Sequence, residues 1–228
     1  MLNLCVYGCV VTTAELLKDV RQHSIVDIYQ SSRHIVRARQ GVYACAHITA
    51  QELLALRCGG VLDCVWALDA AGLDVLGCGV DLSAVHVRFR QGDHWARSRM
   101  DMIRAETGTP ITAHWHSWRS ERPSALANRV RSRSWRATHG PRDQRGYFES
   151  LGNIDGVVPL SRVPAAEALA QALLCIPADQ ALRLMAEVED AGALNAAEID
   201  RIVAATPRRT RDALRRQSRR PPADSLSE

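Results

Sequence analysis

Apolar residues near the N-terminus recur with two different periods, and the first of these is helical. Thr12 is placed to accept a hydrogen bond from the first turn of a helix, and Glu15 follows three residues later, as a capping box requires. Leucine and valine side chains then recur at helical spacing. A second short helix is predicted over residues 24–31, with its apolar side chains on one side.

The second period is that of a β-strand. Residues 34–39 alternate, a Gln-Gly pair supplies a turn, and residues 42–45 return as a second strand. Arginines among the alternating residues make this hairpin basic. Two short helices followed by a basic hairpin are typical of a winged helix-turn-helix, so we predict such a DNA-binding domain over residues 1–46.

Helices and strands alternate in the middle of the chain. A helical pattern covers residues 49–72, with Thr49 as its cap and a Gly-Gly pair at residues 59–60 that splits it into two helices. Two alternating stretches, residues 84–90 and residues 110–118, predict strands.

The segment 164–206 is predicted as three helices, which begin near Pro164, Pro177 and Asn195. We therefore expect an α+β fold: an N-terminal winged helix-turn-helix, followed over residues 47–206 by a mixed helical domain with a small β-sheet.

Nearly all of the basic charge is arginine, and its placement is more informative than its amount. The chain has 29 basic and 25 acidic residues, a net charge of +4, and Lys18 as its single lysine. A GC-rich genome explains much of this bias, although arginine also binds phosphate better than lysine. Eight arginines fall within residues 119–145, which we predict to be a basic insertion in the mixed domain. Residues 207–228 are predicted to be a basic, proline-containing tail.

The arginine-rich insertion and tail are both suited to phosphate backbones. Three tryptophans lie close to the insertion in sequence and are suited to stacking on bases: Trp115, Trp118 and Trp135. The alternative is an ordinary exposed loop with Trp115 buried, and for the tail a helix end or linker.

The cysteines and histidines lack a familiar metal-binding spacing. The seven cysteines are odd in number and include no Cys-x-x-Cys pair, which argues against a disulfide framework and a standard zinc site. We expect reduced, buried thiols. His114 and His116 share one face of a predicted strand and, with His86 and His94, imitate a metal site, but a structural or surface role is favoured. We predict no metal and no cofactor.

Motifs of common enzyme classes are missing from the sequence. It has no Gly-x-Ser-x-Gly elbow, no phosphate-binding Gly-Lys-Ser loop and no Gly-x-Gly-x-x-Gly turn before a helix. Asp81 and Asp93 are isolated loop acids rather than a catalytic pair. The apolar start is too short for a membrane span. We expect a non-enzymatic, cytoplasmic protein that does not enter a membrane.

The N-terminal region resembles a known family in two stretches, Val10–Leu17 and His34–Ala44. These are similar to the N-terminal domain of the AbiEi-type antitoxins of type IV toxin–antitoxin systems. The hallmark of that domain is a wing with the sequence Leu-Val-Arg-x-Arg-Arg-Gly-Val-Tyr. The corresponding residues here are Ile35-Val36-Arg37-Ala38-Arg39-Gln40-Gly41-Val42-Tyr43.

The resemblance extends over most of the chain. Gly59–Leu68, Val85–Arg88 and the helices after Leu160 are similar to the next region of actinobacterial and mycobacteriophage homologues. In many of those proteins a very-short-patch-repair-like (Vsr-like) endonuclease domain follows. This chain ends at Glu228, about where such a domain would begin, and we expect it to lack the nuclease.

The winged helix-turn-helix hypothesis assigns DNA contacts to eight side chains. The helix over residues 24–31 would lie in the major groove, and the hairpin arginines would meet phosphates or the minor groove. The predicted DNA-binding residues are Gln22, His23, Ser24, Gln30, Arg33, Arg37, Arg39 and Gln40. The alternative is that the hairpin arginines form only a solvated face.

The resemblance implies a DNA-binding regulator of the antitoxin kind, which binds operator DNA as a homodimer, represses its own locus and counters a cognate toxin. Two other functions remain open. One is the DNA-recognition part of a truncated or split Vsr-like nuclease system, with a separate nuclease partner. The other is a protein-interaction module in phage or host defence.

Overall fold

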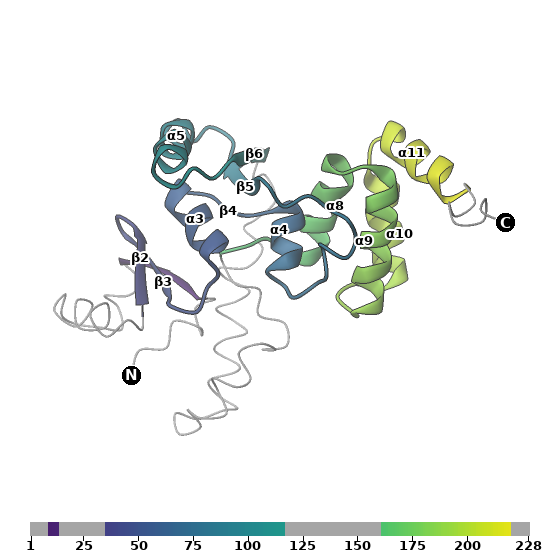
Figure 1. Ribbon diagram of the computed structural model, residues 1–228, viewed down its shortest axis with the longest axis horizontal. Coiled ribbons are helices and arrows are strands. Elements are labelled where there is room, and N and C mark those ends of the chain that lie inside the picture. The colour runs from purple at the N-terminus through teal and green to yellow at the C-terminus, as the bar shows by residue number, and fades with distance from the viewer. Residues whose placement is uncertain (1–8, 14–34, 117–160, 220–228) are drawn as a thin grey trace, which may run out of the picture. The chain divides into compact units, whose positions relative to one another are not determined.

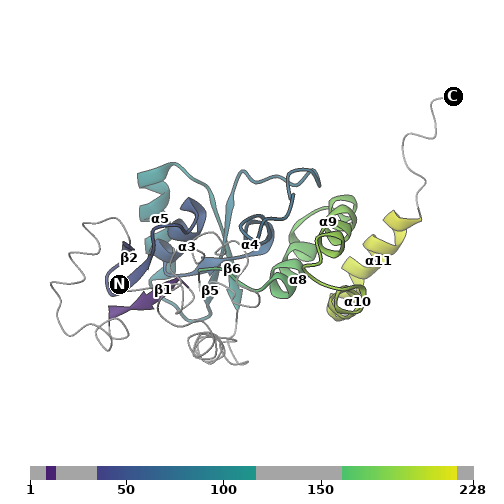
Figure 2. The same cartoon turned by 90° about the horizontal axis from the view of Figure 1, so that it is seen from below.

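The computed structural model describes residues 9–13, 35–116 and 161–219, which form two compact units (Figures 1 and 2). The first unit comprises Met1–Leu62 and Val87–Val163, and the second comprises Asp63–His86 and Pro164–Glu228. Helices and strands occur together, which confirms the α+β class. The predicted boundaries of the DNA-binding domain at residue 46 and of the mixed domain at residue 206 stay predictions.

A three-stranded antiparallel sheet begins the first unit. Its strands are β1 (Val10–Thr12), β2 (Ile35–Arg39) and β3 (Val42–Cys45), in the order β1-β3-β2. The predicted hairpin is confirmed. Gly41 has a φ of 73°, a left-handed conformation that a two-residue hairpin turn requires. Strand β1 was not predicted.

Helix α3 (Ala50–Cys58) holds this sheet against the rest of the first unit. Thr49 caps the helix, as predicted, and Glu52 completes the capping box. Leu56 packs with a buried cluster formed by small side chains of the hairpin, and Leu53 lies against the same cluster. The small side chains allow the helix to approach the sheet closely.

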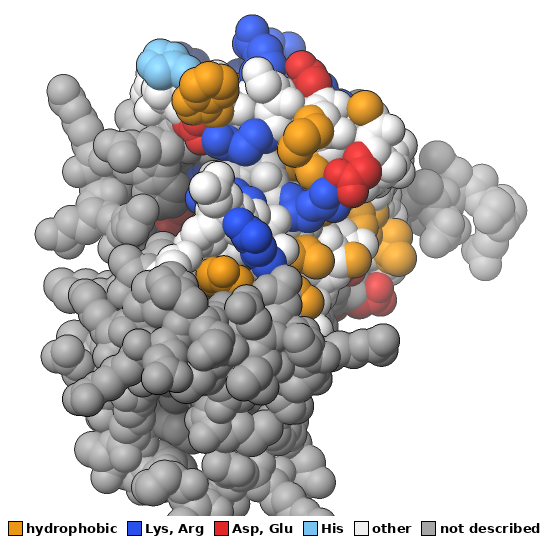
Figure 3. Space-filling view, turned by 90° about the vertical axis from the view of Figure 1, so that its left-hand side faces the viewer, with side chains coloured by type: hydrophobic (Ala, Val, Ile, Leu, Met, Phe, Trp, Pro, Cys, Tyr) orange, Lys and Arg blue, Asp and Glu red, His pale blue; other side chains and the backbone are white. Residues whose placement is uncertain are grey.

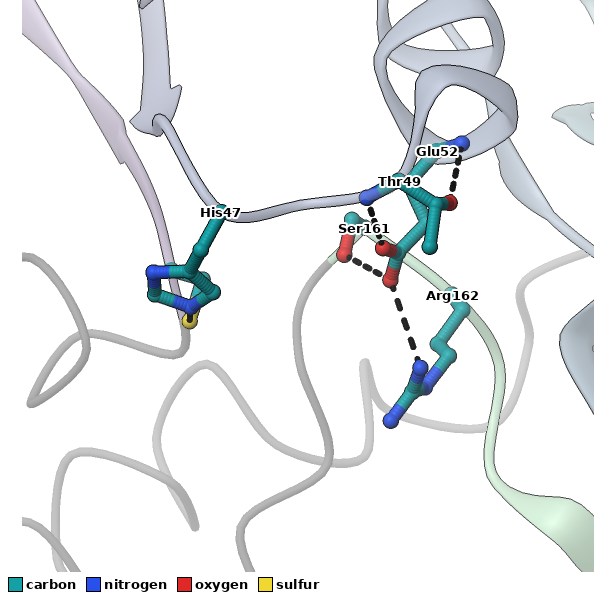
Figure 4. A network of polar contacts seen from close by, with 6 residues as sticks. His47, Thr49, Glu52, Ser161 and Arg162 are labelled. Carbon is teal, nitrogen blue, oxygen red and sulfur yellow. Dashed lines mark hydrogen bonds and ion pairs between the residues drawn. The ribbon is translucent and has the colours of Figure 1, made fainter. Parts of the chain in front are cut away.

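The carboxylate of Glu52 is the centre of a buried polar network (Figure 4). Glu52 is only 3% exposed. Its carboxylate accepts hydrogen bonds from the Thr49 backbone N–H at 2.8 Å and from the Ser161 hydroxyl at 2.8 Å. The Arg162 guanidinium lies 3.6 Å away and supplies the opposite charge. The network therefore joins the start of α3 to a segment more than a hundred residues later in the chain.

A second sheet contains β4 (Val61–Leu62), β5 (Val85–Arg90) and β6 (Ile111–His116), in that order. The predicted strands at 84–90 and 110–118 are confirmed by β5 and β6. The predicted split of residues 49–72 into two helices at the Gly-Gly pair is confirmed by α3 and a second helix, α4 (Cys64–Asp69), but strand β4 between the two helices was not predicted. At Gly60 a Cβ atom would lie 2.5 Å from the Arg88 carbonyl oxygen, so glycine permits this close approach.

Helix α5 (Ala96–Thr107) was not predicted. It packs against α3 in the first unit and buries Ala96, Met100 and Ile103, which lie on one side of the helix. Its remaining surface carries arginines together with acidic side chains and the exposed Met102.

In the described part of the second unit the regular elements are helices, apart from the start of β5. Helix α4 packs against α8, and α11 packs against α9. The three helices predicted over 164–206 are confirmed as α8, α9 and α10. The bounds are α4 (Cys64–Asp69), α8 (Ala165–Cys175), α9 (Ala178–Asp190), α10 (Ala196–Ala205) and α11 (Arg208–Ser218).

Half of the predicted tail, 11 residues, forms helix α11. It begins directly after Pro207, a residue well suited to the start of a helix because it lacks the backbone N–H that would be unsatisfied there. Leu214 is its one buried residue among exposed arginines, so the apolar periodicity is too weak to recognise in the sequence.

Several sequence predictions lie outside the described residues. These are the two N-terminal helices beyond Thr13 and the basic insertion at 119–145. Among the helices that are described, none combines the length and the apolar character needed to cross a bilayer.

We expect Glu52→Ala to lower the free energy of unfolding by about 2–4 kcal/mol, because the Ser161 hydroxyl and the Thr49 N–H then lose a buried acceptor. Urea denaturation followed by circular dichroism measures the change. The matched control is Glu106→Ala, which removes the exposed partner of Arg57 and should cost less than about 1 kcal/mol. Equal effects of the two substitutions would contradict the importance of the buried network.

Candidate nucleic-acid interface

A β-bulge determines which side chains the hairpin exposes. The pairing of β2 with β3 shifts between Arg37 and Arg39, so that Ala38 is the extra residue. Ala38 is 5% exposed and belongs to the buried cluster beside α3. Arg37 and Arg39, on either side of it, are exposed. The bulge thus anchors the strand at one residue and presents two guanidinium groups to solvent.

Arg39 lies in a region of mixed charge near α5. Burial is the largest cause that lowers the pKa of Arg39, the charge of Arg99 lowers it further, and Asp93 acts in the opposite direction. A guanidinium remains protonated despite such a shift. Arg99 itself pairs with Asp93 and donates from Nε to the Cys58 carbonyl oxygen at 2.6 Å. Arg99 is therefore held in place, while Arg39 remains exposed and charged.

Arginines are spread over the face that carries β2 and α5, among hydrophobic side chains and several carboxylates (Figure 3). Some of the positive charge in the first unit is already paired: Arg57 with Glu106, and Arg104 with Asp101. Within the described residues, Arg37 forms no ion pair with a carboxylate, so its charge remains available for an anionic partner.

Two tryptophans in the first unit are exposed. Trp115 on β6 is 46% exposed, and its ring lies beside that of Phe89 in a tilted arrangement, with a centroid distance of 5.4 Å and an interplanar angle of 33°. The alternative in which Trp115 is buried is therefore wrong, and a stacking role stays a prediction. Trp95, directly before α5, is 72% exposed and was missed by the sequence reasoning. Trp118 lies outside the described residues, as does Trp135.

Three of the eight predicted DNA-binding residues are described, and the hairpin brings them together. Arg37 and Arg39 lie on β2, and Gln40 lies in the turn; all three are exposed. The other five lie outside the described residues: Gln22, His23, Ser24, Gln30 and Arg33.

A group of metal-ligand side chains lies at the opposite end of the hairpin from the turn. The Cys9 sulfur is 3.3 Å from Nε2 of His47, and Cys45 completes the group, with all ligand atoms within 4.8 Å of one another. The backbone bond from Cys45 N–H to the Cys9 carbonyl, at 2.9 Å, brings the two cysteines together. The search for closely spaced metal ligands in the sequence did not find this group, because 36 positions separate Cys9 from Cys45. Two thiols and an imidazole suit a soft divalent metal.

The four histidines considered together in the sequence do not share one unit. His86 belongs to the second unit, whereas His94, His114 and His116 belong to the first. The expectation of reduced, buried thiols is confirmed for five of the six described cysteines, and Cys175 is exposed.

No protein-family model matches the chain, and neither a curated protein nor a solved structure was found to match it.

We expect Ala38→Asp to lower the free energy of unfolding by about 3 kcal/mol or more, because it places an unpaired carboxylate in an apolar cluster. Arg37→Ala, one position away on the exposed side, is the matched control and should change stability by less than about 0.5 kcal/mol. Thermal and urea unfolding measure both variants. Tolerance of Asp at position 38 would rule out the bulged arrangement.

Proposed function

We propose that the chain is a non-enzymatic DNA-binding regulator, and that the β2–β3 hairpin is the wing of a winged helix-turn-helix that contacts the phosphate backbone. The observation that carries the proposal is the anchored basic hairpin. Arg37, Arg39 and Gln40 are exposed along it, while Ala38 is fixed in the cluster against α3.

The sheet order supports the winged form of the motif. Strand β1 pairs with β3, so the hairpin is extended by a strand from before residues 13–34. That interval can accommodate two short helices, since the mean helix has about 11–12 residues. In this proposal the helix predicted over residues 24–31 enters the major groove, and the hairpin lies along the adjacent backbone.

The chemistry of the exposed side chains suits this role. A guanidinium forms a planar fork that matches a phosphate with two hydrogen bonds. Arg37 and Arg39 are close neighbours on one strand, so they can engage successive phosphates, and the Gln40 amide at the turn can reach a sugar or a base edge. An anchored hairpin loses less conformational entropy on binding than a free loop.

A second basic surface, on α11, supports binding of a nucleic-acid backbone. The exposed arginines there are Arg208, Arg209, Arg215, Arg216 and Arg219. Asp212 pairs with Arg208 at 3.6 Å. The positive charge of the other four arginines is not balanced by any further acidic residue of the helix. Such a surface adds affinity without reading sequence.

The resemblance of the wing to AbiEi-type antitoxins extends the proposal to a biological role. The chain would bind operator DNA as a homodimer, repress its own locus and counter a cognate toxin. The hairpin contacts are the part of this proposal that the described residues support.

We expect Arg37→Ala/Arg39→Ala to weaken binding to the DNA upstream of the protein's own gene by roughly tenfold or more. The slope of log affinity against log salt concentration should fall by about 2, since two phosphate contacts are lost. Fluorescence anisotropy across a salt series measures both. The matched control is Arg201→Ala, which removes an exposed arginine from α10 of the second unit and should leave affinity and slope unchanged.

Different outcomes separate the alternatives. Binding that ignores sequence would reduce the proposal to backbone affinity. Wild-type protein that binds no DNA even at low salt would refute it and favour a protein-interaction module. An unchanged salt slope in the double variant would refute the role of the hairpin and direct attention to α11.

A further inference from the structure

Three metal-ligand side chains from distant parts of the sequence meet inside the second unit. Cys64 is the first residue of α4, His86 lies near the start of β5, and Cys175 is the last residue of α8. Their sulfur and nitrogen atoms all lie within 4.8 Å of one another. In a tetrahedral zinc site, neighbouring ligand atoms are about 3.5–3.8 Å apart, given the usual zinc–sulfur and zinc–nitrogen bond lengths. Small side-chain movements would bring these three to that spacing.

The backbone of the second unit places these residues together. The Asp63 N–H donates to the His86 carbonyl at 3.0 Å, which sets the start of α4 beside β5. The Trp66 indole donates to the Ala84 carbonyl at 2.7 Å and reinforces the same contact. Helix α8 packs against α4, and the end of α8 brings Cys175 to Cys64.

Cys64 has an uncommon backbone conformation, with a φ of 58°. Left-handed φ values are unfavourable for side chains other than glycine, asparagine and aspartate, and they persist where the surrounding structure requires them. Among the described residues, the only other non-glycine with a positive φ is Cys9, which belongs to the cysteine–histidine group of the first unit. In both groups, then, a strained cysteine orients its sulfur towards a second cysteine and a histidine.

The three side chains have the chemistry of a zinc site. Cys64 is fully buried, and its sulfur lies against a second sulfur and an imidazole. A divalent cation would displace the thiol protons, because two thiolates and a neutral imidazole are strong zinc ligands.

We propose that Cys64, His86 and Cys175 bind a zinc ion that joins α4, β5 and α8 within the second unit. Zinc takes a fourth ligand, either water or another side chain. On binding, each thiol gives up its proton to solvent, so that about two protons are released per zinc. The site is structural: it fixes the ends of elements that the chain brings together from sequence positions far apart.

The test uses the full-length chain, purified reduced, stripped with a chelator and titrated with ZnCl₂ and separately with CoCl₂. We expect tight zinc binding with release of protons, a rise in the unfolding temperature of roughly 5 °C or more, and a cobalt spectrum with thiolate charge-transfer bands. Metal content is measured by elemental mass spectrometry.

The decisive variant is Cys175→Ser, because Cys175 is exposed and its replacement leaves the core unchanged. We expect it to lose about one zinc per chain relative to wild type, with weaker thiolate bands. Cys78→Ser is the matched control, since Cys78 is a cysteine of the same unit outside the group, and its zinc content should equal that of wild type. Any zinc that Cys9, Cys45 and His47 hold is present in both the wild type and the variant. The difference in zinc content between the two proteins therefore reports only the site of the second unit.

Three results would overturn the proposal. The first is a reduced wild-type chain that takes up neither zinc nor cobalt. The second is a folded Cys175→Ser variant with the full wild-type metal content and an unchanged cobalt spectrum. The third is a Cys64–Cys175 disulfide in the protein as purified. If the proposal holds, single histidine-to-alanine variants across the whole chain then determine whether a side chain supplies the fourth ligand.

Discussion

The arrangement of the first unit depends on one buried carboxylate. Glu52 caps its own helix, accepts a hydrogen bond from Ser161 and lies against the charge of Arg162. A buried carboxylate is unfavourable unless every acceptor position is satisfied, so the helix and the later segment stabilise each other. Because α3 also carries the leucines that pack under the hairpin, the same interaction fixes the surface on which the two exposed arginines lie. Within the part of the chain that the structure describes, the proposed wing thus packs on the core chiefly through one short helix, α3.

The elements with strong local signals were predictable. Thr49 and Asn195 precede glutamate at the spacing of a capping box, and both helices begin where the sequence indicates. The hairpin was equally clear from its alternation and its glycine turn. Local chemistry decides these features, so tertiary context adds little to them.

The missed elements depend on contacts that no local pattern contains. Strand β4 is only two residues long and exists because β5 pairs with it. Helix α5 has no side-chain cap, and its three buried residues are separated by polar side chains and by the exposed Met102. Both metal-ligand groups were missed because spacing rules detect ligands that are close in sequence, whereas Cys64 and Cys175 meet only when α4 packs on α8.

The interleaving of the two units has a consequence for synthesis of the chain. Glu52 and Ser161 are 109 positions apart, and the whole front part of the second unit is made between them. At about 5–20 residues per second, a ribosome needs roughly 5–20 s to cover that interval. During this time the Glu52 carboxylate of the nascent chain has neither Ser161 nor Arg162 as a partner and remains hydrated. A fragment ending soon after α3 would lack these partners permanently, so we expect the hairpin and α3 to be less stable in such a fragment than in the full chain.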